Sequence, residues 1–188
     1  MPNITEKQFK LLEKLCNACA VSGDESEVRK IILEEVKPYA DTVKVDALGN
    51  VLVTKNGSGE NKVKVMLDCH MDEVGFMLVA DDGDGLYRFE LVGGIDVRQL
   101  PGKQVLVGKD KTPGVIGARP IHLTTPEERQ KKIPLDALRI DLGPGGKAKI
   151  GDRATFATQF KRVGPSIMAK AIDNRIGCVI LLDLLKTA

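Results

Sequence analysis

The stretch that decides the fold of this chain reads Lys62-Val63-Lys64-Val65-Met66-Leu67-Asp68-Cys69-His70-Met71-Asp72-Glu73. Its first half alternates between polar and apolar residues, which predicts a strand that ends at Asp68. A histidine just past a strand end can present a neutral ring nitrogen to a metal. A carboxylate two residues further on can accept a hydrogen bond from the other ring nitrogen. We therefore expect His70 at the carboxyl end of a central strand, within hydrogen-bond reach of Asp72.

A second motif, Lys170-Ala171-Ile172-Asp173-Asn174-Arg175-Ile176-Gly177-Cys178, lies far downstream. Asp173 stands just ahead of an amphipathic helix, on which apolar residues recur at helical spacing from Ile176 to Leu185. Alone, Asp173 would be a helix N-cap, and His70 alone would more often be a structural histidine than a ligand. Together the two motifs indicate half of a two-metal hydrolase site, so we expect Asp173 to lie close to His70.

The segments before His70 predict helices followed by strands. Thr5-Glu6-Lys7-Gln8 and Ser22-Gly23-Asp24-Glu25 both have the form of a capping box, and each precedes a helical apolar pattern. After Pro38 the period changes to two, which predicts strands at 42–46 and 51–55 joined by a turn. Two helices followed by a sheet are typical of an α/β layer architecture.

Between Val74 and Val163 short β-rich segments alternate with Gly/Pro-rich turns. This pattern predicts a small barrel or sandwich, with one short helix at 126–131. Gly93-Gly94 is expected to serve a turn or bulge, since no helix follows it to bind phosphate. We expect residues 1–73 and 164–188 to form a discontinuous α/β catalytic domain into which residues 74–163 are inserted.

Composition excludes several function classes. The 188 residues carry a net charge of +2, no Lys/Arg block and no tryptophan, which argues against a nucleic-acid partner. The N-terminus lacks the apolar core of a signal peptide, and no apolar run reaches membrane-spanning length, so we expect a cytoplasmic protein with no membrane partner. Of the four cysteines, Cys16 and Cys19 have a metal-binding spacing but fall in a helical pattern, which favours core packing.

The chain resembles the N-terminal half of the M42 metallo-aminopeptidases, a family that includes glutamyl and tetrahedral aminopeptidases and some relatives labelled endoglucanase. The resemblance covers nearly the whole chain, in the family's order. Its motifs are residues 22–25, 46–50, 65–77, 92–94, 114–117 and 170–178. Each motif alone is weak, but the ordered set is specific.

The resemblance implies a phosphorylase/hydrolase-like aminopeptidase catalytic domain, partial here, with an inserted β-barrel that mediates oligomerisation, in this family into dodecamers. It assigns His70 as a ligand of one metal, Asp173 as the bridge between two divalent cations (Zn or Co), and Asp72 as the catalytic residue that orients His70. A peptide would be the substrate. By the same resemblance the Asp173–Asn174 peptide bond is cis. Arg175 either stabilises the geometry of Asp173 or forms a surface ion pair.

Three departures from the family pattern stand out. Cys69 replaces the usual Ala, Asn174 replaces an Asp, and the segment from Ile140 to Asp152 is shorter than expected. In addition, the family's Glu-Glu pair, a further Asp ligand and a late His ligand have no counterpart. We read the chain as an incomplete aminopeptidase that is inactive alone. The alternative is a non-catalytic self-assembly or regulatory module with a vestigial metal site. An endoglucanase is a poorer third, since no pair of glycosidase carboxylates is identifiable.

Overall fold

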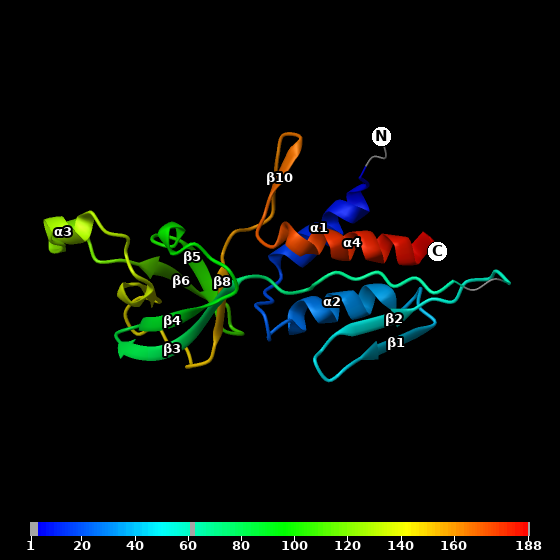
Figure 1. Ribbon diagram of the computed structural model, residues 1–188, viewed down its shortest axis with the longest axis horizontal. Coiled ribbons are helices and arrows are strands. Elements are labelled where there is room, and N and C mark those ends of the chain that lie inside the picture. Colours follow the sequence, from blue (N-terminus) through cyan, green and yellow to red (C-terminus); the bar gives the residue numbers. More distant parts are fainter. Residues whose placement is uncertain (1–3, 61–62, 188) are drawn as a thin grey trace. The chain divides into compact units, whose positions relative to one another are not determined.

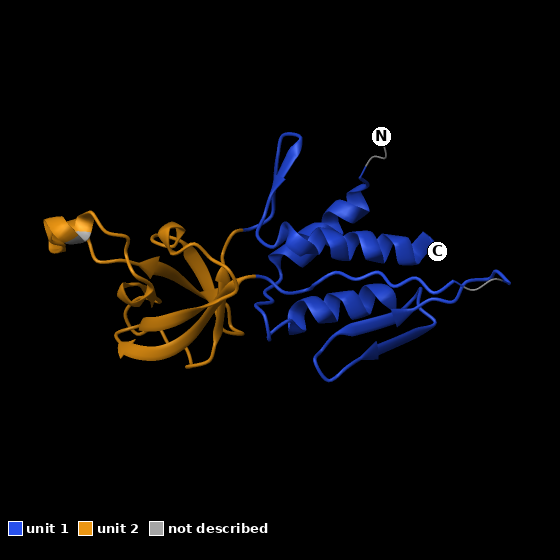
Figure 2. Ribbon diagram, viewed as in Figure 1, with its two compact units in different colours: residues 1–73, 159–188 blue, residues 74–158 orange. Residues whose placement is uncertain are grey.

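The computed structural model describes residues 4–60 and 63–187, and the chain divides into two compact units. Met1–Glu73 and Gln159–Ala188 form the first unit, and Val74–Thr158 form the second (Figure 2). The second boundary falls before the expected residue 164, because β9 (Lys161–Val163) pairs with β10 (Ser166–Met168) and with no barrel strand. No helix in the described ranges is long and apolar enough to cross a membrane.

The first unit begins with the predicted pair of helices, α1 (Glu6–Asn17) and α2 (Ser26–Val36) (Figure 1). The capping box at Thr5 is confirmed, since the Thr5 and Gln8 side chains each accept a hydrogen bond from the other's backbone N–H. The capping box predicted at Ser22 is wrong. Helix α2 begins later, its N-cap is Glu25, and no side chain caps it.

A third helix, α4 (Ile172–Thr187), completes the core of this unit by packing on α1 and α2. Cys16 is fully buried there, as predicted, and Cys178 of α4 is buried with it. The other buried residues of this core are Leu11, Leu12, Leu15, Ala18, Ala20, Val28, Ile31, Ile32, Val36, Phe160, Val179 and Leu182. The core therefore joins segments from both ends of the chain.

Two strands follow α2, as the change of period predicts. Strands β1 (Thr42–Val45) and β2 (Val51–Thr54) pair antiparallel, with Val45 opposite Val51. The turn between them is held by Asp46, whose Oδ1 accepts hydrogen bonds from the backbone N–H groups of Leu48 and Asn50, both at 2.9 Å.

The strand predicted to end at Asp68 is not formed. Residues 63–72 have no strand pairing in the described part of the chain, and the expected first residue, Lys62, lies outside it. The reason is physical: an extended segment becomes a strand only when a neighbour supplies backbone partners, and β1 and β2 pair only with each other. Val63, Val65 and Met66 are consequently 74–85% exposed. The expected central strand is thus an unpaired extended segment that leads to His70.

The second unit is a closed antiparallel barrel with the order β3-β4-β7-β6-β5-β8, which confirms the barrel prediction. Its strands are β3 (Gly75–Gly83), β4 (Leu86–Val92), β5 (Gln104–Val107), β6 (Thr112–Gly117), β7 (Arg139–Asp141) and β8 (Arg153–Phe156). Short helices η1 (Val97–Gln99), η2 (Ile121–Leu123), α3 (Pro126–Arg129) and η3 (Leu135–Ala137) connect them. Closure leaves no unpaired strand edge between the six strands.

Aromatic and branched side chains fill the barrel. Phe76 on β3 packs edge-to-face against Phe89 and Phe156, with both pairs of ring centroids 5.2 Å apart. Gly93 ends β4 with φ +90°, and a Cβ there would lie 2.7 Å from Cγ1 of Val74. The expectation that Gly93 serves the backbone, as a turn residue, is therefore confirmed.

Candidate metal-ligand site

His70 lies between two carboxylates. Its Nδ1 is 2.7 Å from Oδ1 of Asp72, and its Nε2 is 3.0 Å from Oδ1 of Asp173, although 103 positions separate His70 from Asp173 in sequence. Both distances confirm the expected proximities. His70 follows the unpaired segment 63–69 in the chain, and Asp173 lies at the start of α4. The side chain of Asp173 is 94% exposed, so its second oxygen is open to a further partner.

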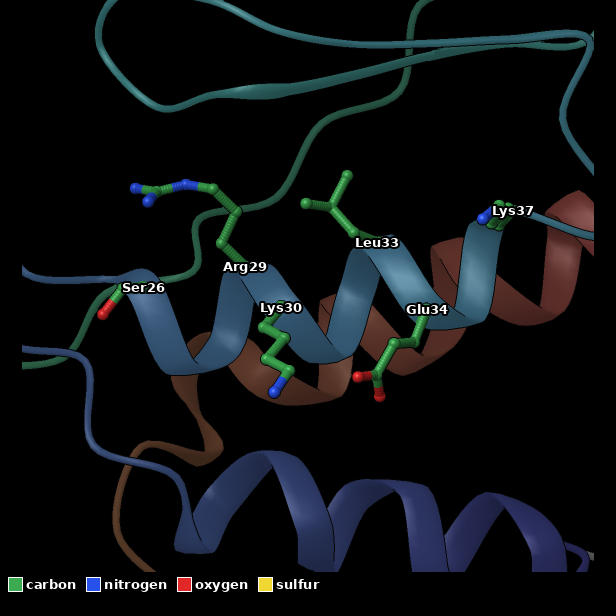
Figure 3. Close-up of a pocket in the computed structure, with 6 residues that line it drawn as sticks. All are labelled: Ser26, Arg29, Lys30, Leu33, Glu34 and Lys37. Atoms are coloured by element: carbon green, nitrogen blue, oxygen red, sulfur yellow. The ribbon is translucent and has the colours of Figure 1, made fainter.

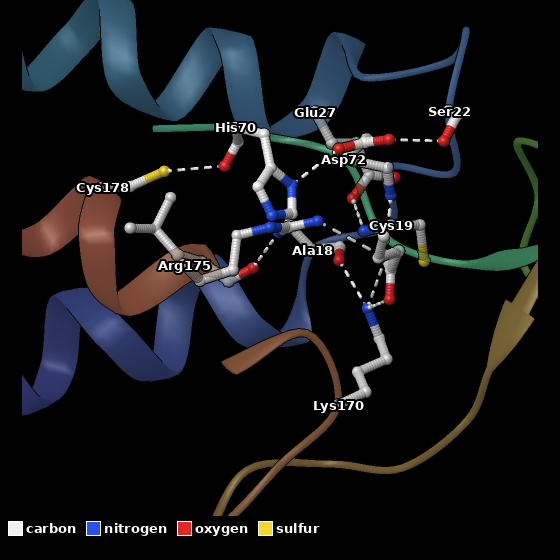
Figure 4. A network of polar contacts seen from close by, with 12 residues as sticks. Ala18, Cys19, Ser22, Glu27, His70, Asp72, Lys170, Arg175 and Cys178 are labelled. Carbon is white, nitrogen blue, oxygen red and sulfur yellow. Dashed lines mark hydrogen bonds and ion pairs between the residues drawn. The ribbon is translucent and has the colours of Figure 1, made fainter. Parts of the chain in front are cut away.

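Ser22 is a member of this site that the sequence did not reveal. Its hydroxyl donates a hydrogen bond to Oδ2 of Asp72, the carboxylate oxygen that does not face His70 (Figure 4). In sequence Ser22 has the form of a helix cap, and that local pattern hid its contact with a residue 50 positions away. The two Asp72 oxygens thus meet two different side chains.

Glu73, the residue after Asp72, forms a buried ion pair with Lys170. The Lys170 ammonium donates to both oxygens of Glu73, at 2.8 and 2.9 Å, and to the carbonyl oxygen of Ala18 at 2.7 Å. Glu73 also accepts from the N–H of Ala20 at 3.0 Å, and its own N–H donates to the Ala20 carbonyl at 2.9 Å. The pair therefore ties the segment that carries His70 to both the α1–α2 connection and the segment before Asp173.

Arg175 is fully buried, so the expectation of a surface ion pair is wrong. Its Nη1 donates to the carbonyl oxygen of Leu15, and its Nη2 is 3.5 Å from Oε1 of Glu73. Within the described residues, Nε and Nη2 make no hydrogen bond. The buried guanidinium of Arg175, on α4, is therefore hydrogen-bonded to the backbone of α1.

The turn that presents Asp173 has a defined backbone. The Asp173–Asn174 peptide bond is cis, as the resemblance implied, and both residues depart from helical dihedral angles. Oδ1 of Asn174 accepts a hydrogen bond from the N–H of Gly177 at 3.1 Å. A Cβ on Gly177 would lie 2.3 Å from that oxygen, so the close approach requires glycine.

Cys69, the residue before His70, packs against Cys178 of α4. Their sulfur atoms are 3.6 Å apart, and the Cys178 thiol also donates to the backbone carbonyl of His70 at 3.5 Å. The hydrogen bond with Cys178 lowers the pKa of the Cys69 thiol, whereas that bond and burial raise the pKa of Cys178. Both contacts hold the backbone at His70 against α4.

The surroundings of the His70 ring favour positive charge. Burial opposes protonation, but the hydrogen bonds with Asp173 and Asp72 outweigh it and raise the pKa of His70 above its ordinary value. Burial likewise opposes ionisation of Asp72, yet the hydrogen bonds with Ser22 and His70 keep its pKa below the usual value. Two carboxylates around one imidazole suit a cation at Nε2.

The donor set fits a divalent cation in kind but not in number. An imidazole nitrogen and a carboxylate oxygen suit zinc or cobalt, and their 3.0 Å separation allows both to face one point. In the described part of the chain, however, no group of three or more His, Cys, Asp or Glu residues is placed to hold a metal. His70 and Asp173 therefore supply an incomplete ligand set.

A surface depression elsewhere in the unit does not belong to this site. It lies along α2 and is lined by Ser26, Arg29, Lys30, Leu33, Glu34 and Lys37 (Figure 3). Arg29 is used structurally, because its Nε donates to the carbonyl oxygen of Gly49 at 2.7 Å and its Nη2 pairs with Glu25 at 3.2 Å. The depression thus includes none of the residues that surround His70.

Comparison with known proteins assigns the chain to a class. Residues 49–188 match the sequence profile described as M42 glutamyl aminopeptidase. Over 194 residues the chain is 30% identical to the glutamyl aminopeptidase of Lactococcus lactis, with 95% of this chain and 54% of that protein covered. The chain belongs to the M42 peptidase family.

Solved structures agree with this assignment. The TET aminopeptidase of a marine sediment thaumarchaeote superposes with a TM-score of 0.89 at 30% identity, covering 97% of this chain and 54% of that one. The Pyrococcus horikoshii TET1 peptidase, which can assemble into a tetrahedron or a large octahedral shell, gives a TM-score of 0.81 at 35% identity. That match covers 96% of this chain and 56% of the other. The chain thus spans about half the length of the relatives it matches.

Proposed function

We propose that this chain forms part of a co-catalytic two-metal aminopeptidase that removes N-terminal residues from short peptides. The observation that carries the proposal is the approach of His70 Nε2 and Asp173 Oδ1 to 3.0 Å, with Asp72 behind the other ring nitrogen. An imidazole oriented by a carboxylate and an exposed second carboxylate are the donors that a divalent-cation site needs. The aminopeptidase names of the relatives support the same reading.

In this proposal His70 is a ligand of one cation, Asp173 bridges two, and Asp72 holds His70 in the tautomer that leaves Nε2 unprotonated. A bound pair of zinc or cobalt ions would supply an activated water and polarise the scissile carbonyl. The remaining ligands and the general base would come from the part of the family's length that this chain does not span, since it covers about half of its relatives.

We further propose that the barrel unit mediates self-association. Its support is the match to a peptidase that can assemble into a tetrahedron or an octahedral shell, and the exposed apolar residues on the short helix η2. This unit would then position copies of the peptidase, while the first unit carries the site.

Metal binding and peptidase activity test the proposal. Zinc and cobalt affinities are measured for the chain, and hydrolysis of an aminoacyl chromogenic substrate is measured for the longer protein that adds the other half of the family's length. His70→Ala and Asp173→Asn should each abolish hydrolysis and weaken metal binding. His122→Ala, in the barrel unit, is the matched control and should change neither. Metal binding that is insensitive to His70 and Asp173 would favour the non-catalytic module.

A further inference from the structure

Ser22 makes a contact that neither its sequence motif nor the proposed ligand set explains. Its hydroxyl donates to Oδ2 of Asp72, while Oδ1 of the same carboxylate faces Nδ1 of His70 (Figure 4). We propose that Ser22 is a positioning residue for the metal site, which acts on His70 through the Asp72 carboxylate. The inference rests on the proposed function and adds a third member to its chain of hydrogen bonds.

The backbone around Ser22 is fixed on the side of Asp72. Val21 forms a parallel bridge with Glu73, and two hydrogen bonds join Ala20 to Glu73, one from each N–H. This pairing holds the two segments side by side, and beside the bridge the Ser22 hydroxyl reaches Asp72. The contact between Ser22 and Asp72 is therefore built by the fold.

Residues 18 and 19, at the start of the segment 18–22, are also held by hydrogen bonds. The carbonyl oxygen of Ala18 accepts from the buried ammonium of Lys170 at 2.7 Å, and the N–H of Cys19 donates to Glu27 of α2 at 3.0 Å. Residues 18–22 are thus held by contacts with α2 and with the segment before Asp173. A hydroxyl on such a segment is well placed to fix a neighbouring carboxylate.

The effect on His70 follows from the two oxygens of Asp72. A carboxylate held at one oxygen can still turn about its last side-chain bond, whereas one held at both cannot turn without losing a hydrogen bond. With Oδ2 held by Ser22, Oδ1 stays opposed to Nδ1 of His70. The Nδ1 proton is then kept in place, and Nε2 remains available on the side of Asp173.

Helix capping does not account for Ser22. Helix α2 begins at Ser26 with Glu25 as its N-cap, so the Ser22 hydroxyl is three positions too early to cap that helix. The serine is instead part of the turn in which the N–H of Asp24 donates to the carbonyl of Val21 at 2.8 Å. That turn is formed by backbone atoms, and the hydroxyl of Ser22 donates to Asp72.

The test observes the Nδ1 proton of His70 directly. Long-range proton–nitrogen correlation spectra of the 188-residue chain resolve the ring nitrogens of its two histidines, and His122 serves as internal reference. We expect Ser22→Ala to speed exchange of the His70 Nδ1 proton with water by about ten- to a hundredfold, the effect of losing one hydrogen bond to a charged acceptor. Cobalt affinity should fall by a similar factor. Ser58→Ala, in an exposed loop, should change neither.

Ser22→Thr and Ser22→Val form a matched pair that differs in the hydroxyl alone, and this pair carries the test if the alanine variant does not fold. Thr should keep slow exchange and Val should lose it. Equal exchange in the two variants, whether slow or fast, overturns the role of the hydroxyl. Asp72→Asn separates the two proposals. If it frees the His70 proton and the Ser22 variants do not, only this inference fails. If it has no effect, the His70–Asp72 pair fails, and the proposed function with it.

Discussion

At the scale of single residues, the orientation of His70 depends on Asp72. Removing the charge of Asp72 leaves the Nδ1 proton with a weaker acceptor and lets the ring adopt the other tautomer. Because partners behind a metal ligand typically contribute about 10–100-fold to metal affinity, we expect Asp72→Asn to weaken zinc and cobalt binding by about that factor. Competition with a chelating dye measures the change. Asp136→Asn, in the barrel unit, is the control, and equal affinities in the two variants would contradict the orienting role.

The buried pair of Glu73 and Lys170 gives a second residue-scale prediction. Glu73→Gln would leave the Lys170 ammonium and the Arg175 guanidinium in the core without an anion, since the side chains of all three residues are at most 4% exposed. Breaking a buried pair from one side costs about 3–5 kcal/mol, so the free energy of unfolding should fall by that amount. Urea titration followed by circular dichroism measures it.

The control for this prediction is an exposed ion pair of the same unit. Glu34 lies 3.3 Å from Lys14, and both side chains are about half exposed, so Glu34→Gln should lower the free energy of unfolding by less than about 1 kcal/mol. Comparable losses in the Glu73 and Glu34 variants would show that the buried pair contributes no more than a surface one.

The sequence predicted that His70, Asp72 and Asp173 lie close together, but it did not reveal the residues that support them. His70, Asp72 and Asp173 could be identified because the spacing of each motif is local and chemically specific. Ser22 could not, since its partner is distant in sequence and its local pattern is that of a helix cap. Nor could the burial of Arg175 be predicted, because a single charged residue in a helix shows no periodicity that reveals which side it faces.

At the scale of elements, the helices and the barrel were predictable from periodicity, whereas the strand before His70 was not. Helices α1, α2 and α4 satisfy their own backbone hydrogen bonds, and the barrel closes on itself. The segment 63–69 has the alternation of a strand but depends on a neighbour for its hydrogen bonds. Whether residues 63–69 form a strand therefore depends on the presence of a neighbouring strand.

This dependence predicts fast amide exchange. In the 188-residue chain, the backbone amides of residues 63–67 should exchange with solvent at nearly unprotected rates, while those of β3 in the barrel are protected. Hydrogen exchange with mass spectrometry measures both segments in one sample. In a longer protein that adds strands beside this segment, the same amides should become protected. Slow exchange of residues 63–67 in the chain alone would contradict the unpaired state.

The barrel carries the third element-scale feature, the exposed apolar residues of η2. Ile121 and Leu123 are 70% and 62% exposed on this short helix, next to α3. If the barrel mediates self-association, the double variant Ile121→Asp and Leu123→Asp should shift the protein toward the monomer, because burying two carboxylates in an interface is costly. Light scattering at micromolar concentration measures the shift. Ile150→Asp, at a separate exposed isoleucine, is the control, and an unchanged mass in the double variant would exclude η2 from the interface.

At the scale of the whole molecule, the two units have different proposed roles. The first unit carries the proposed metal site, and the barrel unit is proposed to mediate self-association. Among the described residues, the side chains that hydrogen-bond to His70 or to Asp72, namely Asp72, Asp173 and Ser22, belong to the first unit. His70 and Asp173 therefore come from sequence on either side of the barrel unit, which explains why they are 103 positions apart. A change inside the barrel core should leave metal affinity unaffected as long as the first unit folds.

The last prediction is that the 188-residue chain alone has no appreciable aminopeptidase activity. His70 and Asp173 are two donors, whereas a zinc or cobalt ion in a catalytic site takes at least three protein ligands, and a co-catalytic pair needs more. With two donors neither cation is held in fixed geometry, so a bound water is not activated and a substrate carbonyl is not polarised.

The measurement is hydrolysis of an aminoacyl chromogenic substrate by the purified chain with added zinc or cobalt, compared with a longer relative of the family. We expect no turnover above that of the free metal ion. Asp136→Asn, in the barrel unit, should match the unaltered chain. Turnover similar to that of the longer relative, abolished by His70→Ala but retained in Asp136→Asn, would contradict the prediction. It would mean that association of several chains brings together the ligands that one chain lacks.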